Sequence, residues 1–137
     1  MKTALDSNII SALWSNESSA IAISEALQRA RGAGALVICG PVYVELAAHP
    51  TVPHKLLDTF LEETGIAVEF ILEERVWKRA AVGFANYAQR RRSSGGTSPK
   101  RLLADFLIAA HATICSDRLF TLDPVRYQQD FPELRLL

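Results

Sequence analysis

The chain opens with Thr3-Ala4-Leu5-Asp6-Ser7-Asn8, where a short apolar strand runs directly into an acid, a hydroxyl and an amide. A second apolar run, Ile9-Ile10, follows at once and is typical of a helix capped by the polar residues. In an α/β protein, a first strand that ends in polar groups usually lies in the middle of the sheet. It delivers those groups to the carboxyl edge, where ligands bind. We therefore expect Asp6 to mark a binding site.

The remaining chain alternates strands with helices. Leu36-Val37-Ile38-Cys39 is continuously apolar, as expected for a strand buried on both faces of a parallel sheet. Further strands are predicted at 67–71, 119–122 and 134–136, and helices at 7–14, 18–31, 42–48, 53–64, 73–92, 102–115 and 124–129. This alternation predicts one domain spanning residues 1–137, with a three-layer α/β/α fold around a mainly parallel sheet of four to five strands.

The composition limits the classes of function. The 137 residues are 49% hydrophobic and 22% charged, which is typical of a soluble globular domain with its own core. Fifteen basic and fifteen acidic residues give a net charge of zero, so any binding of nucleic acid must depend on a local patch. The N-terminus lacks the layout of a signal peptide, and no apolar run reaches the roughly 18 residues of a membrane span. We expect a cytoplasmic protein that does not associate with a membrane.

Asp105 is the most informative acid. It lies in Leu102-Leu103-Ala104-Asp105-Phe106-Leu107-Ile108-Ala109-Ala110, a helix that is apolar on every side and therefore predicted to be buried. A buried carboxylate costs several kcal/mol unless it is paired, hydrogen-bonded or bound to a metal. The alternative to a functional role is an aspartate that is satisfied by a neighbouring arginine or by backbone groups.

Two further acids occupy similar positions. Glu45 lies among apolar residues in the first turns of a helix that follows a strand, and Asp123 directly follows the predicted strand 119–122. Each has an ordinary alternative, because Glu45 could be a solvated helix residue and Asp123-Pro124 a simple turn. Right-handed crossovers nevertheless place all four acids, with Asp6 and Asp105, at one edge of the sheet.

Such a cluster needs compensating charge. Two unit charges about 5 Å apart repel by roughly 3 kcal/mol at an effective dielectric constant near 20. Hard divalent cations with oxygen ligands, Mg²⁺ or Mn²⁺, would offset this repulsion. The sequence therefore predicts a divalent-metal site.

These segments together resemble the PIN-domain ribonucleases, and most closely the VapC-type toxins of bacterial toxin–antitoxin pairs. The resemblance rests on Leu5-Asp6-Ser7-Asn8, Pro41-Val42-Tyr43-Val44-Glu45-Leu46, Ala104-Asp105-Phe106-Leu107-Ile108-Ala109-Ala110-His111-Ala112 and Thr121-Leu122-Asp123. It extends to the tail Phe131-Pro132-Glu133-Leu134 and so covers essentially the whole chain.

The resemblance implies an Mg²⁺- or Mn²⁺-dependent endoribonuclease that hydrolyses RNA through metal-activated water. It implies that the catalytic and metal-ligating residues are Asp6, Glu45, Asp105 and Asp123, with Asp117 as a possible additional acid. Ser7, Asn8 and Thr121 are then expected to orient these carboxylates. It also implies a homodimer and inhibition by a cognate VapB-type antitoxin.

Basic residues surround a glycine- and serine-rich segment, 93–98. Because the net charge is zero, we expect Arg90, Arg91, Arg92, Lys100 and Arg101 to guide the RNA backbone toward the site. The alternative is a solvated helix end whose charges match the helix dipole.

Three other classes of protein are alternatives to the toxin. A housekeeping PIN nuclease of RNA processing would carry the same acids. A non-catalytic binding module on this fold would be expected to have lost some of them. A phosphoacceptor signalling domain requires paired acids after the first strand and a late lysine, and this chain has neither at the corresponding positions.

Overall fold

The computed structural model describes residues 1–95 and 103–137. It contains four strands in one sheet, namely β1 (Thr3–Leu5), β2 (Leu36–Cys39), β3 (Ala67–Glu69) and β4 (Arg118–Phe120). Every neighbouring pair is parallel, and the strand order is β3-β2-β1-β4. The first strand therefore lies between β2 and β4, as its polar carboxyl end predicted.

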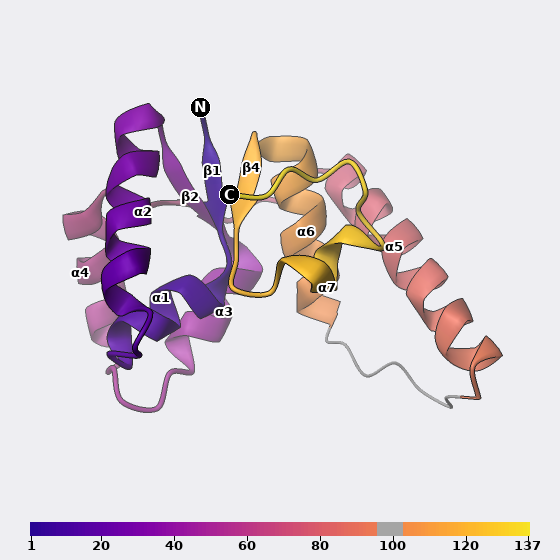
Figure 1. The fold of residues 1–137 in the computed structure, drawn as a ribbon, viewed down its shortest axis with the longest axis horizontal. Coiled ribbons are helices and arrows are strands. Elements are labelled where there is room, and N and C mark those ends of the chain that lie inside the picture. The colour runs from indigo at the N-terminus through magenta and orange to yellow at the C-terminus, as the bar shows by residue number, and fades with distance from the viewer. Residues whose placement is uncertain (96–102) are drawn as a thin grey trace.

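Helices cover both faces of this sheet. They are α1 (Ser7–Trp14), α2 (Ala20–Ala33), α3 (Gly40–Ala47), α4 (Lys55–Thr64), α5 (Glu74–Ser93), α6 (Leu103–Cys115) and α7 (Pro124–Gln128). Figure 1 shows α2 and α4 on one side of the sheet and α5 and α6 on the other. The three-layer α/β/α architecture is confirmed. None of the helices in the described part of the chain combines the length and apolar character needed to cross a bilayer.

The predicted strand at 134–136 is the main difference from expectation. The last residues make a single parallel bridge, between Leu119 and Leu136, and form no ladder. Both of its backbone hydrogen bonds involve Leu119, which donates to the carbonyl of Arg135 and accepts from the amide of Leu137. Side-chain packing, and not strand pairing, holds this tail in position, because Phe131 and Leu134 are buried in the core. The sheet therefore has four strands and not five.

The position of α6 in the core explains why Asp105 is buried. All four residues of β2 are buried, as the continuous apolar run predicted. Eight consecutive residues of α6, from Asp105 to Ala112, are also buried. A helix buried on every side lies between the sheet and a further helix, and α6 does pack closely against α5. Asp105 near the start of α6 is thereby held at the protein interior.

The C-terminal segment is clamped onto α5 by charged side chains. The buried Asp130 carboxylate lies 2.7 Å from Nη1 of Arg90, and Arg79 donates a 2.7 Å hydrogen bond to the Asp130 carbonyl. Arg79 also pairs with Glu133 at 2.7 Å and lies over the Phe131 ring. Because α7 immediately precedes these residues, the clamp fixes the position of α7 relative to the sheet.

Replacing Arg90 with glutamine tests this clamp. The change removes the guanidinium that contacts both oxygens of Asp130, whose side chain is 1% exposed. We expect the free energy of unfolding, measured by urea denaturation, to fall by about 1–3 kcal/mol. Arg92→Gln, at an exposed position in the same helical turn, is the control and should change it by less than about 0.5 kcal/mol. Equal values for the two variants would contradict a structural role for Arg90.

Candidate active site

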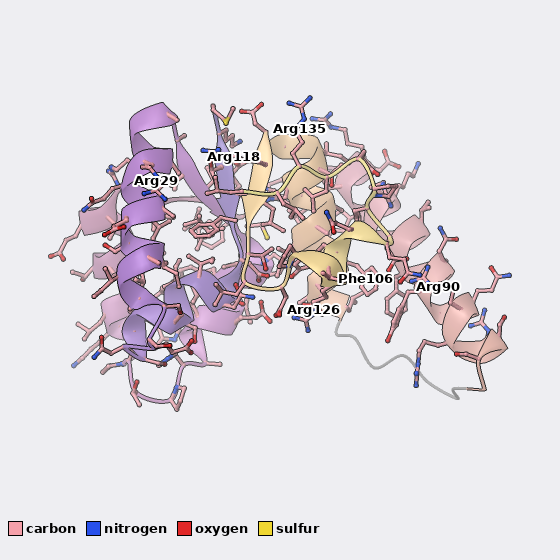
Figure 2. The ribbon with its side chains drawn as sticks, in the orientation of Figure 1. Arg29, Arg90, Phe106, Arg118, Arg126 and Arg135 are labelled. Carbon is pink, nitrogen blue, oxygen red and sulfur yellow. The ribbon has the colours of Figure 1, made fainter. Side chains whose placement is uncertain are left out.

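The strand order brings the predicted acids to one end of the sheet. The strand order reverses at β1, since β2 lies on one side of it and β4 on the other, and such a switch point forms a crevice at the carboxyl ends. Asp6 directly follows β1, while Asp123 follows β4 and begins α7. In Figure 2, Arg126 of α7 marks this end, and Arg118, the first residue of β4, lies at the opposite end.

Asp6 is the most tightly held acid of the site. It is 3% exposed and caps α1, its Oδ1 accepting a 2.8 Å hydrogen bond from the amide of Ser7. Its Oδ2 accepts hydrogen bonds from the hydroxyls of Thr121 at 2.8 Å and Tyr127 at 2.7 Å. These donors come from α1, the end of β4 and α7. Asp6 therefore has one fixed orientation.

Glu45 is connected to Asp6 through Ser7. The Ser7 hydroxyl donates a 3.0 Å hydrogen bond to Oε1 of Glu45, which projects from α3. Partial burial raises the pKa of Glu45, and the nearby carboxyl groups of Asp6 and Asp105 add to the rise, whereas the Ser7 hydrogen bond and Arg126 oppose it. The carboxyl groups of Asp6 and Asp105 are therefore near enough to act electrostatically on Glu45.

Arg126 joins the other two acids. Its Nη2 lies 3.1 Å from Oδ2 of Asp105, and its Nη1 lies 3.5 Å from Oδ2 of Asp123. Asp105 is 6% exposed, whereas Asp123 is open to solvent. The guanidinium therefore bridges a buried carboxylate and an exposed one.

Asn8 and Thr121 connect the segment after β4 to α1 through hydrogen bonds. The Asn8 amide donates to Thr121 Oγ1 at 3.3 Å and to Asp123 Oδ2 at 3.5 Å. Its side-chain oxygen accepts from the amide of Leu122 at 3.2 Å, and Thr121 Oγ1 also accepts from the amide of Asp123 at 3.1 Å. The polar network is continuous from Asp123 through Asn8 and Thr121 to Asp6.

The structure does not bring every predicted residue to this site. The carboxylate of Asp117 accepts a 2.6 Å hydrogen bond from the amide of Lys2, just before β1, and so lies at the opposite edge of the sheet from Asp6. The prediction that Asp117 is an additional ligand is therefore wrong, because this residue lies outside the site. Arg90, Arg91 and Arg92 lie in the last turn of α5, where Arg90 is paired with Asp130. Lys100 and Arg101 lie outside the described residues.

Sequence reasoning missed two residues of the site, Arg126 and Tyr127. Burial, together with the neighbouring Asp6, raises the pKa of Tyr127, which keeps its hydroxyl protonated as a donor. A signal for both was available, since they lie three and four positions after Asp123 in a predicted helical turn. That spacing brings side chains back over the first residue of the turn.

The donor chemistry of the site fits a hard divalent ion. Its potential ligands are carboxylate oxygens, which suit Mg²⁺ and Mn²⁺. Burial raises the pKa of the adjacent Cys39 thiol to about 12, so the thiol is protonated when no ion is bound. Within residues 1–95 and 103–137, however, no three acidic, histidine or cysteine side chains are arranged so that they could hold an ion as they stand. Arg126 lies against two of the four acids.

A parallel sheet with carboxylates at its switch point defines an α/β protein with an acidic site. The model of the PIN domain family matches residues 3–131. The chain belongs to the PIN domain family.

Two solved structures share this fold. VapBC-1 from nontypeable Haemophilus influenzae is 20% identical with a TM-score of 0.64, and the match covers 100% of this chain and 97% of that chain. VapBC2 from Rickettsia felis, bound to a DNA fragment from its promoter, is 19% identical with a TM-score of 0.60, covering 100% and 98%. The comparison with curated proteins gave no significant match.

Replacing Tyr127 with phenylalanine tests the network around Asp6. The variant loses one of the two hydroxyl donors to Oδ2, inside the protein, so we expect the free energy of unfolding to fall by about 1–2 kcal/mol. Tyr43→Phe is the matched control, because the Tyr43 hydroxyl donates to Asp58 at the surface. That change should cost less than about 0.5 kcal/mol. A Tyr127 variant no less stable than the Tyr43 variant would show that the buried hydrogen bond contributes little.

Proposed function

We propose that this PIN-domain chain is an endoribonuclease dependent on Mg²⁺ or Mn²⁺, and that it is the toxin of a VapBC-type pair. One observation carries the proposal. Asp6, Glu45, Asp105 and Asp123 come from four separate segments at the switch point of the sheet, where Ser7 contacts both Asp6 and Glu45 and Arg126 contacts both Asp105 and Asp123. A structural role in the fold does not require acids from four segments to share one edge, and their mutual repulsion opposes it.

These four carboxylates would hold the ion. When bound, a divalent ion supplies activation of a water molecule and neutralises charge on the scissile phosphodiester. The chain itself supplies positioning. Thr121, Tyr127 and the Ser7 amide hold Asp6 in one orientation, and the Ser7 hydroxyl sets Glu45 relative to Asp6. Attack by water and not by the RNA 2′-hydroxyl would leave a 5′-phosphate and a 3′-hydroxyl.

The assignment as a toxin, and the VapB-type antitoxin as its partner, are supported by the two VapBC structures, whose matched chains this fold covers almost completely. A surface suited to a protein partner is also present. Phe70, Ile71 and Trp77, between β3 and the first turns of α5, are 63%, 88% and 52% exposed. Large apolar side chains that are exposed in one short segment are typical of an interface. We propose that a second copy of the chain or the antitoxin covers them.

RNA would be held by the basic end of α5 and the segment that follows it. Arg91 and Arg92, with Lys100 and Arg101, are the residues proposed to contact the phosphate backbone. Arg90 is engaged by the buried Asp130, so its charge is largely committed to the fold. A chain with zero net charge needs such a local patch.

Nuclease activity with Mg²⁺ or Mn²⁺ tests the proposed chemistry. Asp6→Asn should lower the rate of RNA cleavage by about 100-fold or more. The substitution removes a ligand of the ion, and the ion is expected to lower the activation free energy by several kcal/mol. The control is Asp117→Asn, which makes the same chemical change at the opposite edge of the sheet and should retain activity.

Chelation with EDTA should abolish cleavage by the wild-type protein. Equal activity of wild type and Asp6→Asn, or products ending in a 2′,3′-cyclic phosphate, would contradict the proposal.

The salt dependence of RNA binding tests the basic patch. It is measured in the Asp6→Asn background, where we expect cleavage to be at least about 100-fold slower. Converting four proposed contacts to glutamine should weaken binding and reduce the slope of log K against log [salt] by as much as about 0.7 per lost phosphate contact. The variant carries Arg91→Gln, Arg92→Gln, Lys100→Gln and Arg101→Gln.

The control removes four other cations, Arg29, Arg31, Lys78 and Arg135, all of them exposed. The same loss of affinity in both quadruple variants would show that only overall charge matters.

A further inference from the structure

The positively charged Arg126 lies between two carboxylates of the site, those of Asp105 and Asp123. Its two terminal nitrogens contact Oδ2 of Asp105 at 3.1 Å and Oδ2 of Asp123 at 3.5 Å. It also opposes the rise in the pKa of Glu45. The guanidinium therefore acts electrostatically on three of the four acids. This is the same compensation that a divalent ion would give.

The arginine and an ion compete for the same oxygens. A guanidinium donates hydrogen bonds to carboxylate oxygens through the lone pairs that a metal ion would take. In the described part of the chain no three candidate ligands are in a metal-binding arrangement, although the four acids share one edge. Without an ion, Arg126 supplies positive charge beside Asp105 and Asp123.

The geometry also allows the arginine to leave. The Arg126 side chain is 36% exposed and projects from α7, a helix of five residues at the rim of the site. The neighbouring Tyr127 is 1% exposed and bonded to Asp6, so it anchors α7 while the long arginine side chain rotates into solvent. Exchange therefore needs a change of rotamer and no unfolding.

We infer that Arg126 is an internal counter-cation that must release Asp105 and Asp123 before a divalent ion binds. The inference rests on the proposed function and assigns a regulatory contact to the same site. The bound arginine stabilises the metal-free protein and lowers its affinity for metal, because only the fraction of molecules with the arginine released can bind.

Titration of the full-length protein with MnCl₂, followed by calorimetry, tests this inference without any activity assay. Arg126→Gln should bind Mn²⁺ at least about tenfold more tightly than wild type, which corresponds to ~1.4 kcal/mol. Its melting temperature without metal should be lower than that of wild type, and Mn²⁺ should raise it by a larger increment.

Two further variants complete the set. Arg126→Lys keeps the charge but cannot bridge two carboxylates with one planar group, so its Mn²⁺ affinity should be intermediate and its stability close to wild type. Arg29→Gln, on α2, removes a cation at a distance from Arg126, as Figure 2 shows, and should leave Mn²⁺ affinity unchanged.

The outcomes separate the inference from the proposed function. If Asp6→Asn abolishes Mn²⁺ binding but Arg126→Gln and Arg126→Lys bind it no more tightly than wild type, the inference is wrong and the metal site stands. If Asp6→Asn binds Mn²⁺ as tightly as wild type, both the site and the inference are wrong. Tighter binding by Arg126→Gln together with lost binding by Asp6→Asn supports both.

Discussion

Repulsion among carboxyl groups is the constraint on which the structure of this site depends. Parallel strands and right-handed crossovers bring Asp6, Glu45, Asp105 and Asp123 to one edge of the sheet. Each close pair costs roughly 3 kcal/mol at a separation of about 5 Å and an effective dielectric constant near 20. A cluster of acids that is kept despite this electrostatic cost is expected to have a function. Hydroxyl donors at Asp6 and the Arg126 guanidinium at Asp105 and Asp123 offset part of this repulsion.

The response comes mainly from α7 and the residues before it. Tyr127 and Thr121 donate hydrogen bonds to Asp6, and Arg126 bridges Asp105 and Asp123. The position of α7 depends in turn on contacts far from the site, where Asp130 pairs with Arg90 of α5. The long helix α5 is therefore linked to the acids through the C-terminal segment.

Much of this architecture could be predicted from sequence, because the relevant signals are local. The apolar run at β2 and the all-apolar helix around Asp105 correctly indicated burial. The polar end of β1 correctly indicated a central strand. Four acids could be placed at one edge because chain connectivity determines which strand ends meet.

The remaining features depend on tertiary contacts that no local pattern encodes. The tail at 134–136 has the composition of a strand, yet packing of Phe131 and Leu134 leaves it with one bridge. Asp117 resembles a site acid in sequence, but the register of β4 places it beside Lys2. Arg126 and Tyr127 follow Asp123 at helical spacing, but that spacing alone does not show that the turn also packs over Asp6 and Asp105.

A crystal structure of the protein with MnCl₂, using the anomalous signal of manganese, tests the central claim most directly. The account predicts an anomalous peak among the carboxylates of Asp6, Glu45, Asp105 and Asp123, with the Arg126 guanidinium withdrawn from Asp105. A structure at saturating MnCl₂ with no peak at this edge, and with Arg126 still bridging Asp105 and Asp123, would contradict it.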